Sequence, residues 1–181
     1  MIVRQASPEE AYTLWNIRNL AIRHGCQHAY PPDVLAAWTP DRMPASFPAM
    51  IRVNPFFVID GPDGVPVATG SLDLAAASVE AIFTLPDFAG QGMAGLIIDT
   101  IKAEAQQRGY RRLTLESTPN AVSFYQQHGF RQLGESLYPS KLAGCALRCM
   151  AMEIDLSLPT TAGLAKSGKS FPAKDFASPR R

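Results

Sequence analysis

Residues 88–96 have the sequence Phe88-Ala89-Gly90-Gln91-Gly92-Met93-Ala94-Gly95-Leu96, which places three glycines just before a segment with helical periodicity. A glycine-rich bend that enters a helix exposes backbone N–H groups at the positive end of the helix dipole, and such a site binds phosphate oxygens. One glycine would indicate only a turn between a strand and a helix, but three within six residues favour a diphosphate site. The helix is predicted to run to Arg108, with an apolar face formed by Leu96, Ile97, Ile101 and Ala105.

The glycine turn is compatible with more than one phosphate ligand. Because no Gly-Lys-Ser/Thr follows the glycines, an NTP-binding P-loop is excluded. Gly90, Gly92 and Gly95 do spell G-x-G-x-x-G, and Glu116 follows about twenty residues later, so an oxidoreductase that binds NAD or FAD is an alternative. Against it, residues 86–89 separate the glycines from the preceding strand, and too few residues follow for further βαβ units.

The segments around the turn predict an α+β fold. Upstream, three runs rich in β-branched and aromatic residues indicate an antiparallel meander at Phe56–Asp60, Val65–Leu74 and Val79–Leu85. Downstream, the pattern predicts a helix over Pro119–His128 and strands at Arg112–Glu116, Phe130–Glu135 and Cys145–Asp155. We therefore expect a mixed, mostly antiparallel sheet flanked by helices on both faces.

The N-terminal third is predicted to be mainly helical and loop structure after a short strand at residues 1–6. Ser7 is the expected N-cap of a helix that ends near His24, and Glu10 would complete a capping box. Eight prolines occur between Pro31 and Pro66, so this section is expected to hold one short helix, Pro32–Trp38, and connecting loops.

Composition places one domain at residues 1–156 and a flexible basic tail at 157–181. The 181 residues carry a net charge of +1, but the predicted domain has a net charge of −3 and the tail one of +4. The tail is rich in Ser, Pro, Gly and Lys and too poor in apolar residues to fold alone, and docking of nucleic acid by its spaced cations is not favoured. No signal peptide or membrane span is predicted, and three cysteines, an odd number, indicate reduced thiols in a cytoplasmic protein.

A second motif lies downstream of the glycine turn. Residues 120–130, Asn120-Ala121-Val122-Ser123-Phe124-Tyr125-Gln126-Gln127-His128-Gly129-Phe130, contain F-Y-x-x-x-G-F. With the glycine turn, at this spacing, the sequence resembles the GNAT superfamily of acetyl-CoA-dependent N-acetyltransferases, over roughly residues 2–155. The family pattern (Arg/Gln)-x-x-Gly-x-(Gly/Ala) falls on Ala89, Gly92 and Ala94, so Ala89 departs from it, and Gln91 is a candidate to compensate.

The resemblance implies a binding site for acetyl-CoA as co-substrate, with no metal. It assigns the phosphates to the turn, and the pantetheine arm to backbone groups at the end of the preceding strand, where the arm pairs as an added strand would. The implied coenzyme-binding residues are Phe83, Thr84, Leu85, Gly90, Gln91, Gly92, Met93, Ala94, Gly95 and Asn120. A non-catalytic module that senses acyl-CoA is a further alternative.

The resemblance also implies transfer of the acetyl group to a primary amine by direct attack. Tyr125 occupies the tyrosine of F-Y-x-x-x-G-F and is the candidate acid for the departing thiolate; packing on the neighbouring strand is its alternative role. Glu80 is the candidate base, on a strand face expected to be shared with Ile82 and Thr84. Glu116 is an alternative base, and a neutral amine would need none.

The remaining candidate site residues give weaker indications of function. His24-Gly25-Cys26-Gln27-His28 matches no usual zinc spacing, and Cys145 and Cys149 are expected to be small core residues. His28, Tyr30 and Trp38 fall in the proline-rich segment, where the family builds its acceptor pocket. The acceptor itself is left open among small-molecule amines and peptide or protein amines. A homodimer is compatible with the family, and no residue here tests it.

Overall fold

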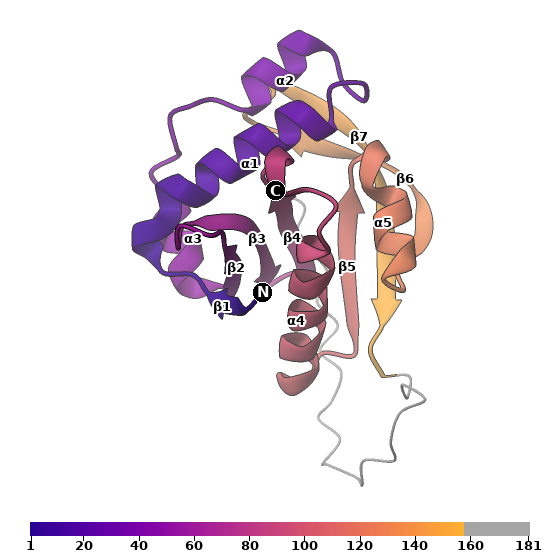
Figure 1. Cartoon of the computed structure of the whole chain (residues 1–181). Coiled ribbons are helices and arrows are strands. Elements are labelled where there is room, and N and C mark those ends of the chain that lie inside the picture. The colour runs from indigo at the N-terminus through magenta and orange to yellow at the C-terminus, as the bar shows by residue number, and fades with distance from the viewer. Residues whose placement is uncertain (158–181) are drawn as a thin grey trace, which may run out of the picture.

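The computed structural model describes residues 1–157, and the predicted tail beyond Ser157 lies outside the described residues (Figure 1). The described chain forms a seven-stranded sheet in the order β1-β2-β3-β4-β5-β7-β6. Its strands are β1 (Val3–Gln5), β2 (Phe56–Asp60), β3 (Pro66–Asp73), β4 (Ser78–Thr84), β5 (Arg112–Ser117), β6 (Arg131–Ser140) and β7 (Cys145–Asp155). Its helices are α1 (Ala11–Gly25), α2 (Pro32–Trp38), α3 (Phe47–Val53), α4 (Met93–Gln107) and α5 (Val122–Gln127), with 3₁₀ turns η1 (Pro8–Glu10), η2 (Pro86–Phe88) and η3 (Pro119–Ala121).

The sheet is antiparallel except between β4 and β5. Strands β1 to β4 form a meander, and β5, β7 and β6 form a second antiparallel group. The two groups meet through one parallel pairing in the described chain, Ser78 with Thr114. This arrangement confirms the predicted α+β class with a mixed, mostly antiparallel sheet.

Helices cover both faces of the sheet, as predicted. Helices α4 and α5 pack against the main core cluster, in which Ile97, Ile98 and Ile101 of α4 are fully buried. Helices α1, α2 and α3 cover the other face through two smaller clusters. In the view of Figure 1, α4 and α5 flank β5, while α1 and α2 lie together near the end of β6 and the start of β7. No helix among residues 1–157 is long and apolar enough to cross a membrane.

Two elements differ from the sequence prediction. The proline-rich segment holds a second short helix, α3, because Pro48 lies in its first turn, where an N–H is not required, and Pro55 lies beyond its end. Strand β6 continues to Ser140, well past the predicted end at Glu135. Pro139 is tolerated there because β6 is the edge strand of the sheet.

An arginine ties the first strand to the start of α1. The Arg4 guanidinium donates to Asp60 Oδ2 and Oδ1 at 2.9 Å each, and to Glu10 Oε1 at 2.5 Å. Glu10 in turn accepts a hydrogen bond from the Ser7 N–H at 2.9 Å, as expected for the capping box. These bonds lower the pKa of both carboxyl groups, chiefly through Arg4.

We expect Arg4→Met to lower the free energy of unfolding by about 1 kcal/mol at pH 7, because it removes a two-carboxylate network at the surface. Carboxyl groups with a lowered folded-state pKa stabilise the fold above the unfolded pKa and lose this effect as the pH falls. The difference between wild type and variant should therefore shrink below about pH 4 in urea unfolding curves. Arg42→Met is the control, since Arg42 is exposed and forms no ion pair within residues 1–157. An equal loss in both variants would contradict the prediction.

Candidate active site

Strands β4 and β5 separate immediately after they meet. The Thr114 N–H donates to the Ala77 carbonyl oxygen at 3.1 Å, and no later residue of β4 pairs with β5 in the described chain. Strand β4 still pairs with β3 as far as Thr84. One edge of β4 beyond Ser78 therefore has no strand partner and is open to an extended ligand.

A bulge interrupts β4 at Ala81. Its φ is +55°, and the register with β3 shifts between Thr69 and Ser71. The extra residue reverses the alternation of side chains. Ile82 packs toward α4, where a Cβ on Gly70 would lie 2.5 Å from its Cδ1.

The bulge overturns one expectation from the sequence. Glu80 was predicted to share a face with Ile82 and Thr84, but it pairs with Ser71 and lies on the opposite face, toward α1. A strict two-residue period cannot reveal this, because the bulge depends on pairing with β3. Thr84 stays on the α4 side and lines the groove described next.

The glycine turn forms one wall of a groove of about 570 Å³. Gly90 and Gly92 have φ of +77° and +81°, which glycine adopts without strain, and Gly92 is the N-cap of α4. The N–H groups of Met93, Ala94 and Gly95 belong to the first turn of α4 and have no intrahelical acceptor. The groove is lined by Thr84, Phe88, Ala89, Gly90, Gly92, Met93, Ala94, Gly95, Leu96, Asp99, Phe124, Gln127 and His128.

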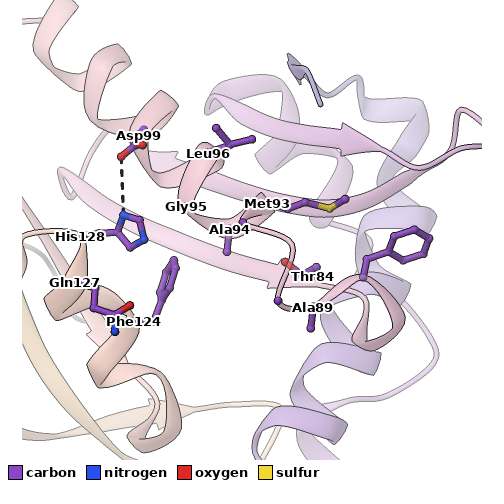
Figure 2. A pocket seen from close by; sticks show the side chains of 13 residues that line it. Thr84, Ala89, Met93, Ala94, Gly95, Leu96, Asp99, Phe124, Gln127 and His128 are labelled. Carbon is purple, nitrogen blue, oxygen red and sulfur yellow. Dashed lines mark ion pairs between the residues drawn. The ribbon is translucent and has the colours of Figure 1, made fainter.

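The opposite wall of the groove comes from α5 and the residue that follows it. Figure 2 shows Phe124 and His128 facing the first turns of α4, with Asp99 next to the imidazole. The His128 Nδ1 lies 4.0 Å from Asp99 Oδ1, and the Lys102 ammonium donates to the His128 carbonyl oxygen. A Cβ at position 95 would lie 2.9 Å from His128 Cε1, so Gly95 also allows the two elements to touch.

Six of the predicted coenzyme-binding residues line this groove, namely Thr84, Gly90, Gly92, Met93, Ala94 and Gly95. The sequence argument missed its α5 wall, although Phe124 and His128 belong to the second motif and could have been included. Gln91 is exposed in the turn. Asn120 lies apart from the lining, and its Oδ1 accepts a hydrogen bond from the Cys26 thiol at 3.4 Å.

The three residues at the end of β4 differ in orientation. The Leu85 N–H donates to the Val67 carbonyl oxygen at 2.8 Å, on the β3 side. Because peptide groups alternate along a strand, the N–H and C=O of Thr84 point to the open edge instead. The Phe83 side chain packs against the smaller cluster that α1, α2 and β7 form, and Leu85 packs against the main core cluster.

Tyr125 of α5 is partly buried and packs against the main core cluster. Its ring contacts Phe124 and Phe130, with centroids 5.1 and 5.9 Å away. Burial raises the pKa of its phenol, and the Glu80 carboxylate raises it further, so the hydroxyl is protonated at neutral pH. The sequence-predicted acid and base therefore lie close enough to interact electrostatically.

The Glu80 side chain reaches solvent, but the surrounding protein removes part of the hydration of its carboxyl group. Loss of hydration raises the pKa of its carboxyl group, and the nearby Asp73 and Glu116 carboxylates raise it further. The Ser78 hydroxyl donates to Glu80 Oε1 at 2.8 Å and partly opposes this shift by stabilising the ionised form. A carboxyl group whose pKa is raised in this way is a stronger base and is better suited to accept a proton.

Residues 26–154 match the family model of the acetyltransferase (GNAT) domain. The chain belongs to the GNAT family. It is therefore an acetyl-CoA-dependent N-acetyltransferase, and neither the dinucleotide oxidoreductase nor the sensor module gains support. A search of curated protein sequences gives no significant match.

Solved structures share this GNAT fold. A GCN5-related N-acetyltransferase from Rhodopseudomonas palustris is 22% identical, with a TM-score of 0.76 over 85% of this chain and 94% of its own. A Salmonella typhimurium acetyltransferase with acetyl-CoA is 19% identical, with a TM-score of 0.63 over 91% and 99%. A Thermoplasma acidophilum N-acetyltransferase in complex with coenzyme A is 15% identical, with a TM-score of 0.64 over 85% and 98%.

We expect Gly92→Ala to weaken acetyl-CoA binding at least tenfold, because a side chain at this φ shifts the N–H groups that face the groove. Acetyl-CoA, but not NAD, should raise the Tm of the wild type, and this rise should be largely lost in the variant. Gly64→Ala is a matched control, since Gly64 has a φ of +79° and, like Gly92, has no atom within 4 Å of an added Cβ. If Gly64→Ala lost the response equally, the effect would be one of general strain.

Proposed function

We propose that this GNAT enzyme transfers the acetyl group of acetyl-CoA to a primary amine by direct attack, with Tyr125 as acid and Glu80 as base. The observation that supports the proposal is that the open edge of β4, which carries Glu80, is followed directly by the glycine turn, and that the Glu80 carboxylate raises the pKa of the Tyr125 phenol. One group is held protonated and the other has a pKa moved toward neutrality, which is the pairing that acid–base catalysis requires.

Coenzyme binding in this proposal uses backbone groups. The N–H groups at the start of α4 bind the diphosphate, and the peptide group of Thr84 pairs with the pantetheine arm along the open edge of β4. This places the thioester near the bulge at Ala81, between the α4 side and the α1 side of the sheet. The domain needs no cationic cluster to hold an anionic coenzyme.

The chemical step then runs in two parts. The amine nitrogen attacks the thioester carbonyl carbon and gives one proton to the Glu80 carboxylate, directly or through water. The C–S bond breaks as the tetrahedral intermediate collapses, and Tyr125 donates its phenolic proton to the coenzyme sulfur. The proton held by Glu80 balances the one lost by Tyr125, so the enzyme returns to its starting state after proton exchange with solvent.

We expect Tyr125→Phe to lower kcat about 100-fold while the Tm rise caused by acetyl-CoA is retained, because the change removes the proton donor but keeps the ring packing. Release of free CoA with an amine panel measures turnover. Tyr110→Phe is the control, since it removes the hydroxyl of another partly buried tyrosine, which donates to the Leu74 carbonyl oxygen at 2.8 Å. Unchanged turnover in Tyr125→Phe would show that Tyr125 serves packing alone.

For Glu80, the pH dependence of kcat/KM is the informative measurement. The base must be ionised, so activity should rise with pH through the raised pKa of Glu80, above the usual carboxyl range of about 4.3. Glu80→Gln should remove this rise of kcat/KM with pH. Ser78→Ala should move its midpoint to higher pH, because it removes the hydrogen bond that favours the ionised form. If Ser78→Ala left the midpoint of this rise in kcat/KM unchanged, the titrating group would be one other than Glu80.

A further inference from the structure

The guanidinium of Arg18 in α1 lies over the rings of two tryptophans. Its guanidinium carbon lies 4.3 Å from the centre of the Trp15 ring and 5.8 Å from that of Trp38. One nitrogen, Nη1, donates to the Trp38 carbonyl oxygen at 3.0 Å and to Asn19 Oδ1 at 2.7 Å. The side chain is therefore fixed in one orientation between α1 and the end of α2.

This cation has no anionic partner among residues 1–157. The described ion pairs of other arginines, such as Arg4, Arg23 and Arg131, each include a carboxylate, but no carboxylate lies within 4 Å of Arg18. Burial lowers the pKa of its guanidinium to about 10, so it still carries its charge at neutral pH. A partly desolvated cation without an anion is unfavourable, which points to a ligand that completes the site.

The unused part of Arg18 has the shape of a carboxylate-binding fork. Within the described chain Nη1 is the nitrogen with acceptors, so Nε and Nη2 remain as two parallel donors on one edge of the guanidinium. Such an edge matches the two oxygens of a carboxylate. A phosphate would bring a second negative charge that one arginine does not neutralise.

Arg18 is linked to the proposed catalytic groups through Tyr138 of β6. The Tyr138 phenol interacts electrostatically with Arg18 and also with the Glu80 and Glu116 carboxylates. Helix α1 packs on β4, and Glu80 lies on the α1 side of that strand, so Arg18 and the two glutamates bring charges of opposite sign to this side of the sheet. An acceptor with charges of both signs would match these charges.

We propose that Arg18 binds the carboxylate of the acceptor, so that this enzyme acetylates amines that also carry a carboxylate, as amino acids do. The inference rests on the proposed function, and it names the substrate class of the same site. The acceptor amine lies toward Glu80 and Tyr125, and its carboxylate lies on the Nε/Nη2 edge of Arg18. Trp15 and Trp38 keep that edge in place.

The test compares amino acids and ω-amino acids with their amides, for example 4-aminobutyrate with 4-aminobutyramide. In CoA-release assays the wild type should prefer the carboxylate member of at least one pair by tenfold or more in kcat/KM. Arg18→Gln should remove that preference by lowering kcat/KM for the acid at least tenfold, while that for the amide changes less than threefold. Arg18→Lys, which keeps the charge without the fork, should fall in between.

Arg23→Gln is the matched control, since Arg23 lies on the same helix, pairs with the exposed Asp41 and donates to the Thr39 hydroxyl and carbonyl oxygens. Arg23→Gln should leave the ratio of kcat/KM for the acid to kcat/KM for the amide unchanged. Equal losses for both members of a pair in Arg18→Gln, or a wild type that prefers amides throughout, would overturn the proposal and assign Arg18 to helix packing.

A binding measurement separates this inference from the proposed reaction. In the presence of CoA, at least one of these amino acids should raise the Tm of the wild type, and Arg18→Gln should abolish that rise. If no amine releases CoA but this stabilisation is present, acetyl transfer fails and the carboxylate site stands. If CoA is released with amines and neither acids nor Arg18 affects rate or Tm, the carboxylate site fails and the reaction stands.

Discussion

The separation of β4 from β5 is the constraint on which the rest of this structure depends. One pairing, Ser78 with Thr114, joins the two halves of the sheet in the described chain, and beyond it β4 has an open edge. Backbone polar groups need partners, so an open edge inside the domain is favourable only where a ligand or water reaches it. The glycine turn and the first turn of α4 follow β4 at the end of this open edge, and α5 forms the facing wall of the groove there.

A bulge of one residue distributes the chemistry between the two faces of the sheet. Because Ala81 is inserted, Thr84 faces the groove beside α4 while Glu80 faces α1. In an unbroken strand the candidate base would point into the core beside Ile97 and Ile101. Backbone strain at one alanine, with a φ of +55°, is thus the local cost of placing Thr84 and Glu80 on different faces of one strand.

Sequence reasoning succeeded where the signal is local. The glycine turn, the start of α1 and the strands of the meander all follow from turn residues, caps and short-range periodicity. The face occupied by Glu80 could not be predicted, because it depends on the register with β3. The surroundings of Arg18 are equally non-local. Trp15 and Trp38 come from different helices, and Tyr138 comes from a strand far along the chain. The length of β6 was missed because proline usually ends a strand, except at a sheet edge.

The contact between Gly95 and His128 determines how the coenzyme groove can behave. Helix α4 and the end of α5 already touch through the imidazole, and the Lys102 ammonium holds the same residue by its carbonyl oxygen. The width of the groove is consequently set by van der Waals contact in the free protein. Little conformational entropy is lost when such a preorganised groove is filled. Contact between its two walls in the free protein therefore favours a groove whose width changes little when a ligand fills it.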